Sequence, residues 1–148
     1  MTFGLIIHIL AAILWVGGMF FAYVVLRPTV QEWEALDRLN LWRGVFQRFF
    51  PWVWASALGL LLSGYVMIFV GFGGFSGAGL HVHVMHFIGL IMITLFCYLY
   101  FVPWPAFRRA VDEGDVAIAA ARLATIRRIV GANLTLGLLT AAIGASGR

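Results

Sequence analysis

The sequence lacks lysine altogether, contains a single cysteine and has very little charge for its length. One cysteine, Cys97, excludes an intramolecular disulfide framework. Only 11% of the 148 residues are charged, whereas 63% are hydrophobic, and soluble domains carry about 25% charged residues. So little charge cannot cover a water-facing surface, which excludes soluble enzymes and nucleic-acid-binding modules. The chain is therefore predicted to be a membrane protein.

The sequence contains several long apolar runs. A membrane-spanning helix needs about 20 predominantly apolar residues. Four stretches satisfy this requirement, at about residues 3–26, 51–72, 80–102 and 124–145, and they leave little chain for a soluble domain. We predict an all-α integral membrane protein, in which residues 1–148 form a single four-helix transmembrane bundle.

The basic residues are all arginine, and nine of the ten lie in two connecting segments, residues 27–48 and 103–128. The positive-inside rule places such segments in the cytoplasm. Both termini are then expected outside, in a multi-pass protein of the inner (cytoplasmic) membrane. We interpret the net charge of +4 as a topology signal that also favours contact with anionic lipid, not nucleic acid. Within the second segment, Asp115 is a predicted helix N-cap.

The two halves of the chain show a weak similarity at a spacing of 78 positions. Residues 7–11 resemble residues 85–89, and residues 57–62 resemble residues 135–140. Spans one–two and three–four would then be parallel repeats, related by an axis along the membrane normal. Such an axis would place the histidines of spans one and three opposite each other across the bundle.

Small residues four apart occur in the second span of each half, at Gly59 and Ser63 and at Gly137 and Ala141. This spacing lets membrane helices approach one another closely. We therefore interpret these residues as helix-packing positions.

All four histidines fall in the outer halves of spans one and three, across the membrane from every carboxylate. That separation disfavours a hydrolytic His–carboxylate triad. His8 and His86 lie at similar depth, and His83, about one turn further out, is the alternative to His86. Ionisable residues at such depth face the bundle interior and mark functional sites. Two imidazoles at matched depth suit a bis-histidine metal site, such as the axial ligation of a b-type haem.

The residues near these histidines favour a large, flat ligand. Ala11, Ala12 and Trp15 follow His8 along one face of the first span, and Gly89 takes the matching place in the third. Small side chains leave room for a porphyrin. We therefore predict a small membrane b-type cytochrome with an electron-transfer or redox role. Its partner would be a membrane quinone or a periplasmic redox protein, and a homo-oligomer is left open.

Copper is the alternative to haem b. The run of His81, His83, Met85 and His86 opens the third span, and imidazole and thioether ligands suit Cu(I). This pattern predicts a copper-binding or copper-transport membrane protein. A third interpretation, from a different class, is a non-catalytic membrane subunit that packs against a larger complex.

The first span, in which residues 8–18 read HILAAILWVGG, is similar to the first-span motif of the copper-resistance D (CopD) family. The HemJ-type protoporphyrinogen oxidases share that motif. Residues 26–28 (Leu-Arg-Pro) and residues 126–138 of the last span resemble the same group. The resemblance covers nearly the whole chain and implies a four-helix membrane module with a haem b or copper-related role. It also implies a haem-dependent oxidoreductase, although HemJ-type proteins have Leu-His-x-Lys where residues 80–83 read Leu-His-Val-His.

Overall fold

The computed structural model describes residues 2–147, and that part of the chain is helical with short links and no strand. In chain order its elements are α1 (Thr2–Phe20), η1 (Phe21–Leu26), α2 (Arg27–Thr29), α3 (Ala35–Val66), η2 (Met67–Gly71), η3 (Phe75–Gly77), α4 (Leu80–Phe101), α5 (Pro103–Asp112) and α6 (Val116–Ser146). Successive elements merge into four helices that are long and apolar enough to cross a membrane: Thr2–Thr29, Ala35–Gly71, Leu80–Asp112 and Val116–Ser146. The predicted four-helix transmembrane fold is confirmed.

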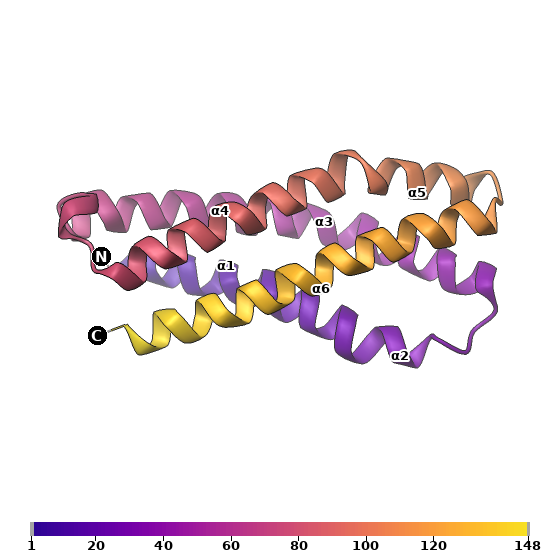
Figure 1. The fold of residues 1–148 in the computed structure, drawn as a ribbon, viewed down its shortest axis with the longest axis horizontal. Helices are drawn as coiled ribbons and strands as arrows, with labels where there is room; N and C mark the ends of the chain where they lie inside the picture. Colours follow the sequence, from indigo (N-terminus) through magenta and orange to yellow (C-terminus); the bar gives the residue numbers. More distant parts are fainter. Residues whose placement is uncertain (1, 148) are drawn as a thin grey trace.

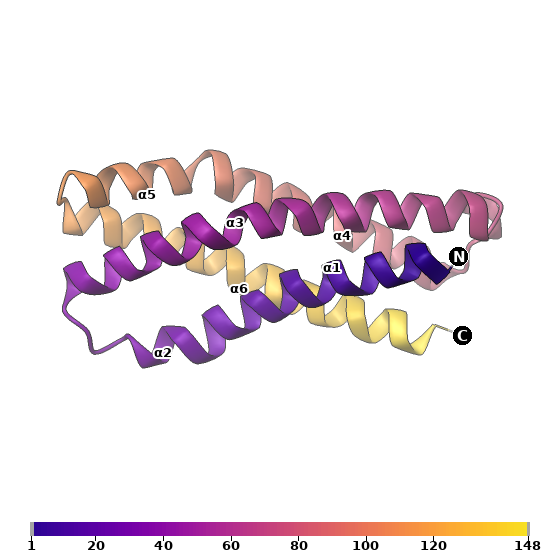
Figure 2. The same cartoon turned by 180° about the vertical axis from the view of Figure 1, so that it is seen from behind.

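The helices form two antiparallel pairs that lie in two layers. Figure 1 is seen from the side of α4, α5 and α6, and Figure 2 from the side of α1 and α3. One end of the bundle, which we call the histidine end, holds the start of α1, the link before α4 and the end of α6. The opposite end, the arginine end, holds the links from α2 to α3 and from α5 to α6. Which end faces outward stays a prediction.

The helices extend well beyond the predicted spans at the arginine end. α3 begins at Ala35 and α6 begins at Val116, so most of the residues expected to connect the spans are helical. Between α4 and α5 the chain changes direction at Pro103, which lacks the N–H needed to continue the helical hydrogen bonds. The limits of the membrane-embedded part of each helix stay predictions.

The tight link between α5 and α6 depends on two neighbouring residues. Gly114 has φ of +73°, a backbone conformation that glycine adopts at little steric cost. The carboxylate of Asp115 accepts a hydrogen bond from the backbone N–H of Ile118 at 3.1 Å. This bond satisfies one of the amide donors that a helix start leaves free. The predicted N-cap at Asp115 is confirmed.

Replacing Asp115 with alanine is expected to lower the free energy of unfolding by about 1 kcal/mol, because the Ile118 amide loses its acceptor. Asp115→Asn keeps an acceptor oxygen and should lose much less. Unfolding of the purified protein in mixed detergent micelles, followed by circular dichroism, measures both variants. Glu32→Ala, in the exposed link before α3, is the charge-matched control. Equal losses in the alanine and asparagine variants would contradict a capping role.

The core is aromatic and is concentrated toward the arginine end. Phe46 and Phe50 of α3 stack with ring centroids 5.1 Å apart, and Trp104 of α5 meets Phe50 edge-on at 5.0 Å. Phe107 is completely buried beside them. Edge-to-face contacts of this kind add to the stabilisation that comes from burial itself. The cluster therefore fixes α5 against α3.

The half of the bundle toward the histidine end has fewer buried residues. None is buried within residues 80–91 of α4 or within residues 138–146 of α6. Contact between α1 and α3 depends there on small residues, since a Cβ on Gly59 would lie 3.4 Å from that of Ala11. Nearer the middle, a Cβ on Gly137 would lie 2.8 Å from a side-chain atom of α1. The packing role predicted for these two glycines is confirmed.

Candidate metal centre

His8 is half-buried in α1 and is oriented by α3. Its Nδ1 lies 3.0 Å from the Oγ of Ser63. The Ser63 hydroxyl donates its one proton to the backbone carbonyl of Gly59, as serine in a helix often does. We therefore assign the Nδ1–H tautomer to His8, in which the Ser63 oxygen accepts from Nδ1 and Nε2 of the neutral ring keeps a free lone pair. Metal-ligating histidines share this arrangement, with one nitrogen held by a hydrogen bond and the other bare.

The histidine run at the start of α4 divides between two faces of the helix. His83 and His86 both pack against the ring of Phe75, with centroid distances of 5.9 and 5.5 Å. His81 and Met85 lie instead against glycines near the end of α6. Residues three or four apart share a helix face, which explains this division. The four predicted copper ligands of α4 therefore lie as two pairs.

His8 and His86 meet the same turn of α3 from different layers of the bundle. His8 is bonded to Ser63, and Tyr65, two residues further along, packs edge-on to His86 with a centroid distance of 5.3 Å. Within residues 2–147, no three His, Cys, Asp or Glu side chains are close enough together to hold one metal ion. In this conformation, one metal ion at the histidine end could therefore bind at most two of the histidines.

The four residues expected to leave room for a flat ligand differ from one another in how closely they are packed. Ala11 is buried against Gly59, and Trp15 is buried in the core, edge-on to a phenylalanine of α4 at 6.1 Å. Ala12 is half-buried. A Cβ on Gly89 would meet nothing within 4 Å. Open space thus lies beside Gly89, whereas α3 and the core occupy the space beside Ala11 and Trp15.

The sequence does not identify Ser63 as the partner of His8, because Ser63 fits a small-residue packing pattern equally well. The contact between His8 and Ser63 can be predicted once the antiparallel register of the first two helices is known. A Cβ on Gly4 would meet Met67, His8 bonds Ser63, and Ala11 meets Gly59, so the register is uniform along this pair. Pairing the first two spans in that register predicts the contact between His8 and Ser63.

Asn133 is a second buried polar side chain, near the middle of α6. It is 2% exposed, and its Nδ2 donates to the backbone carbonyl of Met92 at 3.0 Å. Its Oδ1 has no hydrogen-bond partner in the part of the chain that the structure describes. The Nδ2 bond ties α6 to α4 in the middle of the bundle, whereas the unpaired Oδ1 carries the cost of a buried acceptor without a donor.

Fold and side chains together define a multi-pass membrane protein with four spanning helices and its histidines gathered at one end. The family model described as copper resistance protein D (CopD) matches residues 43–146. The chain belongs to the CopD family. The matched residues include most of α3 and three of the four histidines, whereas the first span lies outside them. No curated protein and no solved structure matches the chain significantly.

Proposed function

We propose that this protein binds copper at the histidine end of the bundle and handles it as cargo in the membrane. The observation that carries the proposal is the hydrogen bond between Ser63 and His8, which leaves Nε2 of His8 free to bind a metal. The family description names copper resistance. Copper is among the metals that imidazole nitrogen suits.

The two pairs on α4 supply the other proposed ligands. His83 and His86 lie against one ring and form an imidazole pair, whereas His81 and Met85 face α6 and form an imidazole–thioether pair. Thioether sulfur selects for Cu(I). Since Cu(I) accepts two ligands, a cluster of three or more side chains is not required. We therefore assign these four residues and His8 as copper ligands.

The arrangement of charge supports an outward-facing histidine end. Nine of the ten arginines lie in residues 27–48 and 103–128, which form the arginine end of the bundle. Under the positive-inside rule that end faces the cytoplasm. Copper would then reach the histidines from outside the inner membrane.

A b-type haem held by His8 and by His86 or His83 is the second candidate, because an axial histidine uses the same bare nitrogen. This haem candidate would have an electron-transfer role, a quinone or periplasmic partner and a HemJ-like oxidoreductase activity. The packing of Ala11 against Gly59 favours copper, because α3 takes up space that a porphyrin beside His8 would need.

Metal analysis and an absorption spectrum of the detergent-purified full chain test the proposal. After loading with Cu(I) and dialysis, the wild-type protein should retain copper and show no haem absorption. His8→Ala should weaken Cu(I) binding at least about tenfold in competition with a chromophoric chelator, as the loss of a ligating group predicts. Asn40→Ala, exposed near the arginine end, is the control and should bind Cu(I) like the wild type.

Two results would count against this function. A Soret band with sharp α and β bands on reduction, in protein free of copper, would replace copper with haem b. Copper binding that survives both His8→Ala and the double change His83→Ala with His86→Ala would show that the ligands lie elsewhere.

A further inference from the structure

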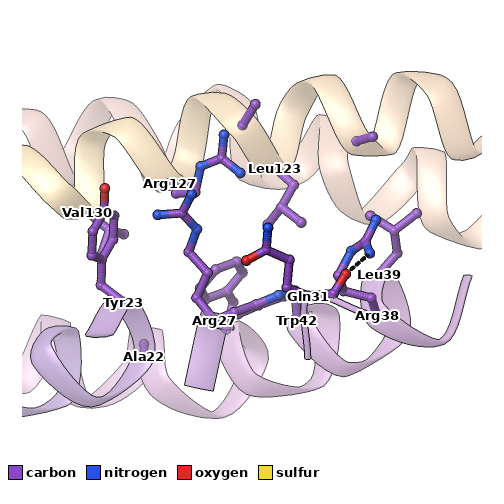
Figure 3. Close-up of a pocket in the computed structure, with 13 residues that line it drawn as sticks. Ala22, Tyr23, Arg27, Gln31, Arg38, Leu39, Trp42, Leu123, Arg127 and Val130 are labelled. Atoms are coloured by element: carbon purple, nitrogen blue, oxygen red, sulfur yellow. Dashed lines mark hydrogen bonds between the residues drawn. The ribbon is translucent and has the colours of Figure 1, made fainter. Parts of the chain in front are cut away.

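A cavity of about 400 Å³ lies at the arginine end, where no histidine lines it (Figure 3). It is open on one side and is bounded by the end of the first helix, the start of α3 and the first half of α6. Three arginines line it, one from each of these elements: Arg27, Arg38 and Arg127. Among the described residues around the cavity there is no carboxylate. Much of the remaining wall is apolar, formed by Ala22, Leu39, Trp42, Phe46, Leu123, Ala124 and Val130.

Two of these arginines are held in place by contacts that leave their charge unpaired. The guanidinium carbon of Arg27 lies 5.0 Å from the centroid of the Tyr23 ring, a cation–π contact. Arg38 donates from Nη1 to two backbone carbonyls of the link before α3, at 2.9 and 3.2 Å. Within residues 2–147 the single ion pair joins Arg43 to Asp112. The cavity therefore collects three positive charges with no carboxylate to balance them.

Arg27 and Arg127 extend toward each other from opposite walls of the cavity, as Figure 3 shows. Like charges repel more strongly beside apolar walls than in bulk water. An anion between the two guanidinium groups would offset that repulsion with two attractions. Arg27 directly follows η1, a π-helical segment that changes the direction of the following side chains relative to a regular α-helix. Such segments are rare and occur frequently at functional sites.

Membrane topology alone does not require this arrangement. The positive-inside effect needs basic residues near the ends of spans, and it does not depend on whether they surround a cavity. Four other arginines meet that need from exposed positions outside the cavity: Arg48, Arg109, Arg122 and Arg128. The positive-inside effect therefore does not explain why Arg27, Arg38 and Arg127 converge on one cavity.

We infer that this cavity binds a phosphate-bearing anion between Arg27 and Arg127, with Arg38 completing the positive wall. Guanidinium groups form paired hydrogen bonds that match phosphate oxygens. The apolar walls favour an amphiphile, and basic pockets between membrane helices are typical sites for anionic lipid headgroups. An anionic phospholipid is thus the favoured source of the phosphate, ahead of free phosphate or a soluble phosphate ester. This site is independent of the proposed copper ligands at the other end.

Native mass spectrometry of the full chain, reconstituted with phosphatidylglycerol and phosphatidylcholine of identical acyl chains, tests the lipid source. The wild-type protein should retain phosphatidylglycerol preferentially. The double change Arg27→Gln with Arg127→Gln should reduce that preference about tenfold or more, since charge-assisted hydrogen bonds are lost. Arg122→Gln with Arg128→Gln removes the same charge from exposed positions and should leave the preference unchanged.

Calorimetric titration of the detergent-purified chain with inorganic phosphate and with glycerol 1-phosphate tests the soluble source. If phosphate binds and only the double change Arg27→Gln with Arg127→Gln weakens that binding, the site is supported and free phosphate is identified as a source. Equal losses in the two double variants, or no selective binding in either experiment, would overturn the site. Arg127→Gln alone, which changes an exposed side chain, replaces the double variant if circular dichroism shows that the latter does not fold.

Discussion

Replacing Phe107 with alanine should cost the bundle about 3–5 kcal/mol of unfolding free energy, the range found for large aromatic residues in well-packed cores. Phe107 is completely buried, and its ring contacts those of Phe46 at 6.4 Å and Trp104 at 6.0 Å. Truncation removes burial and aromatic contacts together and leaves a cavity between α5 and α3. Equilibrium unfolding in mixed micelles, monitored by tryptophan fluorescence and circular dichroism, measures the loss.

Phe87 offers the matched control, since the same substitution can be made at a residue that is 66% exposed on the bundle surface. Phe87→Ala should change the free energy of unfolding by about 0.5 kcal/mol at most, as is usual for surface positions. Comparable losses in the Phe107 and Phe87 variants would mean that the aromatic cluster is not the part that holds the helices together.

Ser63→Ala should weaken Cu(I) binding by about 10- to 100-fold, the usual effect of removing the group that orients a metal-ligating histidine. The substitution deletes the acceptor of the His8 Nδ1–H but leaves every proposed ligand in place. The ring then loses both its fixed tautomer and its fixed orientation. Chelator competition with purified protein measures the change in affinity.

Ser56 supplies the matched control because it is also buried, lies on α3 and is two helical turns away. Ser56→Ala should leave copper affinity unchanged. If Ser63 acts through His8, adding Ser63→Ala to His8→Ala should have little further effect, and the two changes should not be additive. Fully additive losses would show that Ser63 affects copper binding by another route.

The class of protein and its helices could be predicted from the sequence because both depend on local composition. Four apolar runs are enough to identify four spanning helices, and an aspartate before an alanine-rich stretch is enough to identify the cap at Asp115. The same local logic identified Gly59 and Gly137 as packing positions. None of these predictions required knowledge of how one helix is rotated against another.

The candidate sites depend on that rotation, and the sequence determined them only in part. The spacing of His81, His83 and His86 does not say which residue faces α3 and which faces α6, because packing across the bundle sets that choice. The contact between His8 and Ser63 requires the register of two helices. The basic cavity brings together Arg27 and Arg127, which are far apart in the sequence, and a π-helical segment precedes the first of them. The distribution of arginines along the sequence predicts that nine of them share one side of the membrane, but it does not predict that three of them converge on one cavity.

The uneven distribution of buried residues along the bundle has a consequence for how a ligand could exchange. Aromatic packing joins the helices near the arginine end, whereas residues 80–91 and 138–147 include no buried residue. Local opening free energies in proteins follow such differences in packing, from near zero at loosely packed segments to the global value in the core. We therefore expect the start of α4 and the end of α6 to separate and close again more readily than the aromatic half of the bundle. Metal exchange at the histidines would then proceed while the rest of the bundle stays folded.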